Sequence, residues 1–348
     1  MEHEFCSVCI AVYPKLKKFH TLSSSIDALY STMDTYRSQL SGKSPLVIGL
    51  SGGVDSTVIA TVAADLKLPL RLIHFDNGWN TSLAVANINK ILDKFDLPID
   101  TFVQDWNVFK SLQRSFLFSG VPDLELISDH AIFALMSNYL VLNNYRFVVS
   151  GANFTTEHGL NLEYGWNKLD YRNIKAINEA YENVDLRDYP NSSTLRWAID
   201  RALSRKRKVL LPLNSFYYKR SAAIAFLSEK ISFADYEFKH EESLITKVYQ
   251  RLILPKKYNY FKVEDHVNAL VRNKEITKKQ ATYHLQSFKD SEIDAYELQY
   301  FKDKLELSDR DWGVILGAKK RHSDFKNSQA LYKGLQKMSS ILKMSSMS

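Results

Sequence analysis

Cysteine is scarce in this sequence, and long apolar runs are absent. Only two cysteines, Cys6 and Cys9, occur among 348 residues, which excludes the disulfide framework of small secreted proteins. No segment reaches the roughly 18 consecutive apolar residues of a membrane-spanning helix. Met1–Glu4 carries no basic region followed by an apolar one, so we expect no secretory signal peptide. These absences favour a cytoplasmic protein without a membrane span.

The Walker ATP-binding loop is absent as well. Gly42-Lys43-Ser44 resembles the end of that loop, but Arg37 stands where its first glycine is required. The triplet also precedes the first predicted strand instead of following it. We therefore interpret it as a solvated linker.

The composition is that of a globular protein of about two domains. Hydrophobic residues make up 45% and charged residues 24% of the chain, and the net charge is +7. A basic balance suits anionic partners such as nucleotides, nucleotide-sugars or RNA, although a lysine-rich surface also serves solubility alone. The basic run Ser204–Lys208 has the same two interpretations.

Apolar runs and helical patterns alternate along the first two thirds of the chain, which predicts a parallel sheet with right-handed crossovers. The predicted strands are Pro45–Leu50, Leu70–Phe75, Ile99–Val103 and Arg146–Ser150. The predicted helices are Asp55–Leu66, Thr81–Phe95, with Thr81 as N-cap, and His130–Asn144. Further helices are predicted at Ser24–Leu40, Ala222–Lys230, Glu241–Leu252, Val263–Val271 and Ile293–Leu305. We thus expect a lead with a helix (1–44), an α/β domain (45–215), a helical C-terminal domain (216–343) and a disordered tail (344–348).

The clearest local motif is Ser51-Gly52-Gly53-Val54-Asp55-Ser56-Thr57, between the first predicted strand and helix. Two glycines let the backbone turn tightly and approach a ligand, and the helix N-terminus favours an anion. A carboxylate at Asp55 would repel phosphates unless it holds Mg²⁺, which screens the charge. The motif therefore predicts a binding loop for Mg²⁺ and a polyphosphate.

This loop resembles the signature loop of the PP-loop ATP pyrophosphatases. The resemblance implies an α/β fold with a doubly wound parallel sheet of the adenine nucleotide α-hydrolase type, and cleavage of ATP to AMP and pyrophosphate. It also implies that Asp76 and Asn77, after the second strand, bind adenosine, and that Gly151 approaches the α-phosphate. Asn153 and Glu157 are expected to orient the acceptor or a metal, and we place them with Asp55 in the catalytic set. His74 is interpreted as a core histidine.

Four segments further resemble the N-acetyl sugar amidotransferases of lipopolysaccharide and surface-glycan biosynthesis. They are the loop with Asp76–Trp79, Ser150–Glu157, Leu169–Ile177 and Lys239–His266. The resemblance implies a nucleotide-linked acetamido sugar as substrate: ATP adenylates the amide oxygen, ammonia attacks the carbon, and an acetamidino group forms. Candidate substrate-binding residues are Asp129, His130, Asp170, Arg172, Lys239, His240, Glu242 and His266. For Lys239, His240, Glu242 and His266, the alternative interpretation is a solvated helix face.

The sequence departs from this family at two places. Ala152 stands where the family has an acid, and Cys6-Ser7-Val8-Cys9 is the only one of two expected cysteine pairs. His3 and His20 would be needed to complete four zinc ligands, and we favour a pair without zinc.

The nitrogen donor is expected to be ammonia. No cysteine follows Cys9 and Met1 is followed by Glu2, so neither glutaminase class has its nucleophile. The resemblance implies a separate glutaminase subunit similar to that of imidazole glycerol phosphate synthase, with a cyclase-like subunit as a further candidate. Two alternatives remain: a PP-loop enzyme of tRNA modification, which the position of both cysteines disfavours, and a nucleotide-binding regulator, which the intact Asp55 disfavours. We expect no nucleic-acid partner.

Overall fold

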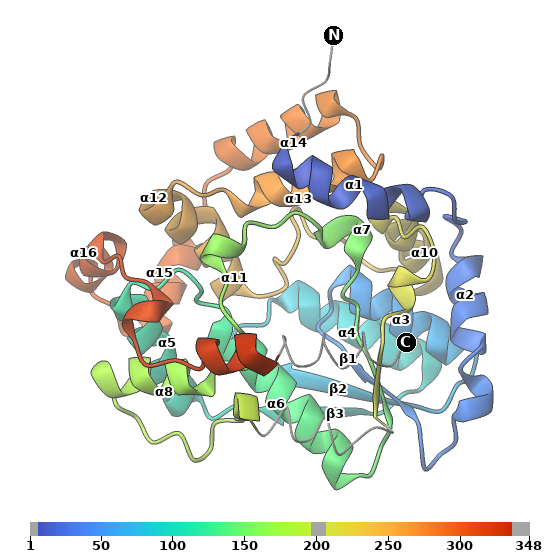
Figure 1. Ribbon diagram of the computed structural model, residues 1–348, viewed down its shortest axis with the longest axis horizontal. Coiled ribbons are helices and arrows are strands. Elements are labelled where there is room, and N and C mark those ends of the chain that lie inside the picture. The colour runs from blue at the N-terminus through green and yellow to red at the C-terminus, as the bar shows by residue number, and fades with distance from the viewer. Residues whose placement is uncertain (1–5, 196–206, 336–348) are drawn as a thin grey trace. The chain divides into compact units, whose positions relative to one another are not determined.

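Five parallel strands form the sheet of this computed structural model, which describes residues 6–195 and 207–335 (Figure 1). The order across the sheet is β3-β2-β1-β4-β5. The strands span β1 Leu46–Gly49, β2 Leu70–Asp76, β3 Ile99–Val103, β4 Phe147–Val149 and β5 Lys208–Leu210. The first four were predicted, and β5, which pairs in parallel with β4, was not.

The central strand β1 is apolar along its whole length because both faces of the sheet are covered there. Leu46, Val47 and Ile48 are at most 1% exposed, so side chains pointing to opposite faces are all buried. Leu46 is in register with Leu70 of β2 on one side and with Phe147 of β4 on the other. The predicted parallel α/β architecture is therefore confirmed.

Two compact units divide the chain, and each is built from several segments. The first unit comprises Met1–Val103, Leu142–Asn161 and Lys208–Phe301, and holds the whole sheet. The second comprises Gln104–Val141, Leu162–Arg207 and Lys302–Ser348. The units are defined by contacts between segments that are distant along the chain, and the expected consecutive ranges stay a prediction. The expected tail, 344–348, lies outside the described residues.

In the first unit, α3 (Val54–Asp65) packs against β1 and β2, with α2 (Asp27–Asp34), α4 (Ser82–Phe95) and α10 (Arg220–Ile231) beside it. The predicted cap of α4 is confirmed, since the Thr81 hydroxyl accepts a hydrogen bond from the Ala84 N–H at 3.2 Å. The short turn η3 (Pro212–Asn214) packs on α2. The predicted helix Ser24–Leu40 is shorter than expected and continues as η1 (Arg37–Gln39).

The rest of the first unit is helical. α1 (Ser7–Phe19), which was not predicted, lies beside α13 (Lys262–Arg272) although the two are far apart in sequence (Figure 1). α13 in turn packs against α14 (Lys278–Asp290), also unpredicted. α7 (Phe154–Glu157) and most of α15 (Ala295–Lys304) also belong to this unit.

The helix predicted over Glu241–Leu252 is wrong in its bounds and its geometry. The structure has α11 (Leu244–Val248), a π-helical stretch η4 (Tyr249–Ile253) and α12 (Leu254–Tyr258). Pro255 lacks an N–H, and its ring would clash with the carbonyl one turn earlier, so the helix widens before it.

The second unit is built from helices with short turns between them. They are α5 (Trp106–Ser119), α6 (Leu126–Leu142), η2 (Leu162–Tyr164), α8 (Tyr171–Ala180), α16 (Asp309–Gly317) and η5 (His322–Asp324). α6 begins four residues before its prediction. Across the described ranges of both units, no helix combines the length and the apolar character needed to cross a membrane.

Candidate functional site

The site lies where the strand order reverses. β1 stands between β2 and β4, so the loops that follow β1 and β4 leave the carboxyl edge of the sheet in opposite directions. The two loops nevertheless touch: a Cβ added to Gly151 would lie 3.0 Å from the Asp55 Cβ. A side chain at position 151 would force the Asp55 segment to shift, and the predicted approach of Gly151 to the α-phosphate stays a prediction.

The phosphate loop has the backbone that its two glycines predict. Gly52 has a φ of +81°, and a Cβ there would lie 2.5 Å from the Ala84 carbonyl oxygen. Gly53 is the N-cap of α3, and its N–H donates to the Ser51 hydroxyl at 3.3 Å. The Ser51 and Ser56 hydroxyls lie 3.3 Å apart, at the N-terminus of the helix, where an anion is favoured.

Two members of the predicted loop face inward. Val54 is 5% exposed, so it contributes its backbone and a core side chain. Thr57 is fully buried and its hydroxyl donates to the Gly53 carbonyl at 2.7 Å, which leaves ligand contact to the two serines.

Asp55 is surrounded by donors from three distant segments. The buried Tyr218 hydroxyl donates to Oδ1, and the Asn153 amide donates to Oδ2 at 3.3 Å. The Lys239 ammonium lies 3.6 Å from Oδ2. Burial, followed by the charge of Asp55, raises the pKa of Tyr218 well above its ordinary value, so its hydroxyl stays protonated.

Glu157 shares the Lys239 ammonium with Asp55. Its Oε1 lies 2.9 Å from Nζ, and its Oε2 accepts the Asn153 N–H at 3.2 Å. Burial alone would raise the pKa of Glu157, but the charges of Lys239 and His240 outweigh it and lower this pKa. Likewise burial would lower the pKa of Lys239, and its two carboxylate partners raise it. The predicted set of Asp55, Asn153 and Glu157 is therefore one contiguous cluster centred on Lys239.

At the end of β2, Asp76 and Asn77 shape the turn. Asp76 Oδ1 accepts from the Gly78 N–H at 2.8 Å and from the Asn80 amide at 3.1 Å, and Asn77 Oδ1 accepts from the Trp79 N–H at 3.2 Å. Both residues are half-buried, and adenosine binding there stays a prediction. His74 is a core histidine, as interpreted: its Nδ1 contacts the Leu50 carbonyl at 2.8 Å.

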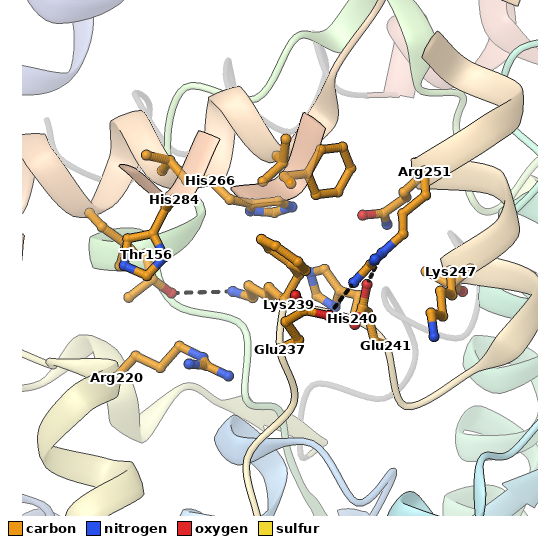
Figure 2. A pocket seen from close by; sticks show the side chains of 17 residues that line it. Thr156, Arg220, Glu237, Lys239, His240, Glu241, Lys247, Arg251, His266 and His284 are labelled. Atoms are coloured by element: carbon orange, nitrogen blue, oxygen red, sulfur yellow. Dashed lines mark hydrogen bonds and ion pairs between the residues drawn. The ribbon is translucent and has the colours of Figure 1, made fainter. Parts of the chain in front are cut away.

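The segment after Lys239 folds onto the phosphate loop. The Thr81 N–H donates to the Glu242 carbonyl at 3.0 Å, and the Leu244 N–H donates to the Trp79 carbonyl at 2.9 Å. A Cβ on Gly53 would lie 3.2 Å from the Glu242 carboxylate, which itself faces His240 at 3.8 Å. Figure 2 shows Lys239, His240 and His266 grouped in one pocket. Four predicted substrate residues thus gather beside the loop.

The other four predicted substrate residues belong to the second unit and have structural contacts there. His130 is fully buried, with Nδ1 at 2.8 Å from the Lys168 carbonyl and Nε2 accepting from Ser192. Asp170 caps α8 and also accepts from Trp166. Asp129 pairs with Lys168 at 2.9 Å, and Arg172 is exposed. Their role in substrate binding stays a prediction.

Three site residues escaped the sequence analysis. Tyr218 holds Asp55, the Tyr236 hydroxyl donates to the Gly52 carbonyl at 2.9 Å, and the Asn87 amide lies 3.5 Å from the same oxygen. None belongs to a motif, since each reaches the loop from a distant helix or connection.

The cysteine pair opens α1. Cys6 Sγ lies 3.3 Å from Cys9 Sγ, and the hydrogen bond that the Cys9 N–H donates to Cys6 Sγ lowers the pKa of Cys6. His20 ends the same helix, so about 16 Å of helix rise separates it from Cys9 and it cannot join their ligand set. His3 lies outside the described residues, as do positions 204–206 of the basic run. The absence of zinc stays a prediction.

Two family models match separate parts of the chain. The model described as LPS biosynthesis protein WbpG-like, C-terminal domain, matches residues 242–339, and that of the queuosine biosynthesis protein QueC matches residues 45–183. A search of curated proteins found no match. Similar solved structures include NMN synthetase from Francisella tularensis, with 13% identity and a TM-score of 0.39 over 83% of this chain and 96% of that chain. Another is the NH3-dependent NAD synthetase from Campylobacter jejuni, with 15% identity and a TM-score of 0.33 over 84% and 93%.

Proposed function

We propose that this chain, which combines a QueC-like PP-loop ATP pyrophosphatase domain with a WbpG-like C-terminal domain of lipopolysaccharide biosynthesis, is an ATP-dependent amidotransferase. Its fold is the five-stranded parallel sheet of the adenine nucleotide α-hydrolase type with a helical C-terminal region. The proposed substrate is a nucleotide-linked sugar with an acetamido group, which becomes an acetamidino group.

One observation supports the proposal most: the Lys239 ammonium lies between the carboxylates of Asp55 and Glu157 beside the phosphate loop. The Ser51 and Ser56 hydroxyls and the start of α3 would hold the β- and γ-phosphates. The ammonium and the nearby Gly151 would then face the α-phosphate, where negative charge develops as pyrophosphate leaves.

The reaction needs no side-chain nucleophile. The amide oxygen attacks the α-phosphorus and pyrophosphate leaves, which gives an O-adenylated imidate. Ammonia then adds to the imidate carbon, a proton is lost, and AMP departs with the former amide oxygen. Catalysis would consist of positioning the reactants and stabilising charge.

Mg²⁺ is expected to enter with ATP. The described residues contain no group of three or more His, Cys, Asp or Glu side chains placed to hold a metal, so phosphate oxygens must complete its coordination. Asp55 and Glu157 offer carboxylate oxygens, the donors that Mg²⁺ prefers, once Lys239 turns to the phosphates.

The test combines ATP, ¹⁵N-ammonium and a panel of nucleotide-linked sugars with and without acetamido groups. We expect AMP and pyrophosphate by phosphorus NMR, and ¹⁵N in the sugar product by mass spectrometry. Asp55→Ala and Ser51→Ala should abolish both, while Ser41→Ala, outside the loop, should not. Formation of ADP and orthophosphate would refute the proposal.

The alternative of tRNA modification gains one observation, the match of residues 45–183 to a queuosine biosynthesis protein. That range covers the ATP-binding part and ends before Lys239. The match therefore supports ATP chemistry more than it supports tRNA as the acceptor substrate. In the same assay, ATP turnover stimulated by tRNA and not by any sugar would favour this alternative.

A further inference from the structure

A cavity adjoins the phosphate site on the side of Lys239. Its volume is about 110 Å³, and its wall includes Thr156, Phe238, Lys239, His240, His266 and Val267 (Figure 2). Lys239 donates to the Thr156 hydroxyl at 3.3 Å and reaches Asp55, so one ammonium contacts both the cavity and the loop. A single water needs about 10–15 Å³ on this measure, so the cavity has room for a group of several heavy atoms but not for a nucleotide.

The buried wall of the cavity carries a histidine without a partner. His266 is 7% exposed, and neither ring nitrogen has a hydrogen-bond partner among the described residues. Burial, and then the neighbouring charges of His240 and Lys239, hold its pKa well below the ordinary value. The ring is therefore neutral and offers one donor and one acceptor. Leaving both unused costs stability, which points to a ligand that uses them.

The cations around the cavity already have partners. Arg251 pairs with Glu241 and with Glu237 at 3.0 Å, and Lys247 pairs with Glu297 at 2.7 Å. Arg220 pairs with Asp235, and Lys239 pairs with Glu157. With no surplus positive charge, the cavity suits a neutral polar group better than a phosphate or a carboxylate.

One side of the cavity is apolar. Val263 and Val267 of α13 pack with Phe288 of α14, and Phe238 meets Phe288 edge-on at a centroid distance of 5.0 Å. Leu270, one turn after Val267, extends this wall. The cavity therefore presents an apolar surface beside the neutral donor–acceptor pair of His266.

We propose that this cavity receives the acetamido group of the substrate, with the methyl group against Val267 and Leu270 and the amide on His266. This assignment rests on the proposed function. It places the amide oxygen next to Lys239 and thus next to the phosphate loop. It also makes Val267 and Leu270 the residues that determine the length of the accepted acyl group.

The acyl length provides the first test. Val267→Ala should raise kcat/KM for an N-propionyl sugar at least tenfold relative to its N-acetyl counterpart, and Val267→Leu should raise KM for the N-acetyl sugar. Asn268→Ala, exposed on the same helix, serves as the control. An unchanged acyl preference, or a change in KM for ammonium alone, would overturn the assignment, because the cavity would then serve another reactant.

A second test does not depend on turnover. The probe is 2,2,2-trifluoroacetamide, observed by fluorine NMR. It should bind the wild-type protein and lose at least tenfold in affinity in His266→Leu, while the thermal midpoint of this variant rises by about 2 °C or more because an unsatisfied polar group is removed. A lower midpoint with unchanged probe binding would make His266 structural and reject the cavity. Binding that depends on His266, in a protein that turns over no acetamido sugar, would reject the proposed function and keep the cavity.

Discussion

The Asp55 carboxylate depends on a hydroxyl that lies 163 positions further along the chain. Tyr218 is fully buried and donates to Oδ1, which fixes the carboxylate beside Lys239. Tyr218→Phe keeps the ring in the core and removes only the donor. We expect kcat for AMP formation to fall about 10- to 100-fold, the usual effect of losing a hydrogen bond to a charged group, with little change in folding.

The neighbouring residue supplies the control. The Tyr217 hydroxyl is also buried, but it donates to the Asn273 carbonyl and not to the site. Tyr217→Phe should therefore affect thermal stability more than turnover. Equal losses of kcat in the two variants would show that Tyr218 acts through the fold and not through Asp55.

A second prediction at the residue scale concerns His322. It is 2% exposed, and burial lowers its pKa to about 4. The unfolded chain takes up the proton near pH 6.5 and the folded chain only near pH 4, so stability is complete above pH 6.5 and falls between these values. The full loss is about 3 kcal/mol. Urea unfolding monitored from pH 7 to pH 4 should show this slope, and His322→Gln should flatten it; an equal slope in both proteins would contradict the assignment.

The sequence predicted the residues of the site whose signals are local. Gly52, Gly53 and the serines of the loop follow one strand and open one helix, and their geometry needs no distant partner. Tyr218 and Tyr236 contribute single hydroxyls across long separations, which no spacing in the sequence reveals. Lys239 was singled out only through resemblance, and its place between two carboxylates arises from the tertiary fold.

At the scale of elements, the turn between β1 and α3 carries a testable constraint. Gly52→Ala forces a side chain into a left-handed conformation and against the Ala84 backbone, 2.5 Å away. The cost should be about 2 kcal/mol or more. Gly53→Ala has an ordinary φ of −80° and meets only the flexible Glu242 and Ser51 side chains, so it should cost less. Denaturant titration without ATP measures both, and equal losses would argue against the strained turn.

Helices with local capping signals can be predicted from the sequence, whereas elements that depend on distant contacts cannot. α4 was predicted with its cap because Thr81 and the apolar spacing are adjacent in sequence. α5 was not predicted, although it carries comparable local signals, with Asp105 as N-cap and Gly120 as C-cap. β5 is three residues long and partly exposed, and only its pairing with β4 makes it a strand. The π-helical stretch before Pro255 likewise depends on a backbone conflict that periodicity does not encode.

At the scale of the whole molecule, the proposed function leads to a prediction about the nitrogen source. No cysteine follows Cys9, so this sequence offers no nucleophile for a glutaminase elbow. We expect the purified chain to use ammonium and not glutamine, with a rate that rises with pH as more NH₃ becomes available. We further expect a separate glutaminase subunit, of the imidazole glycerol phosphate synthase type, to confer use of glutamine.

Steady-state assays with each nitrogen source provide the measurement. Glutamine used as efficiently as ammonium by the chain alone would contradict the prediction of a partner. With glutamine as the nitrogen source and little ammonium present, addition of the candidate glutaminase should restore turnover in proportion to the amount of complex formed. A catalytically dead glutaminase is the matched control and should leave the rate unchanged.

The interleaving of the two units has a consequence for synthesis on the ribosome. The sheet cannot be completed until β5 is made, about 60 residues after β4, and the first unit still awaits residues up to Phe301. At about 5–20 residues per second, β4 waits several seconds with an unpaired edge. A nascent chain halted at residue 183, where the queuosine-type match ends, would still present that edge. Chaperone demand should therefore peak in this interval and not at the end of translation.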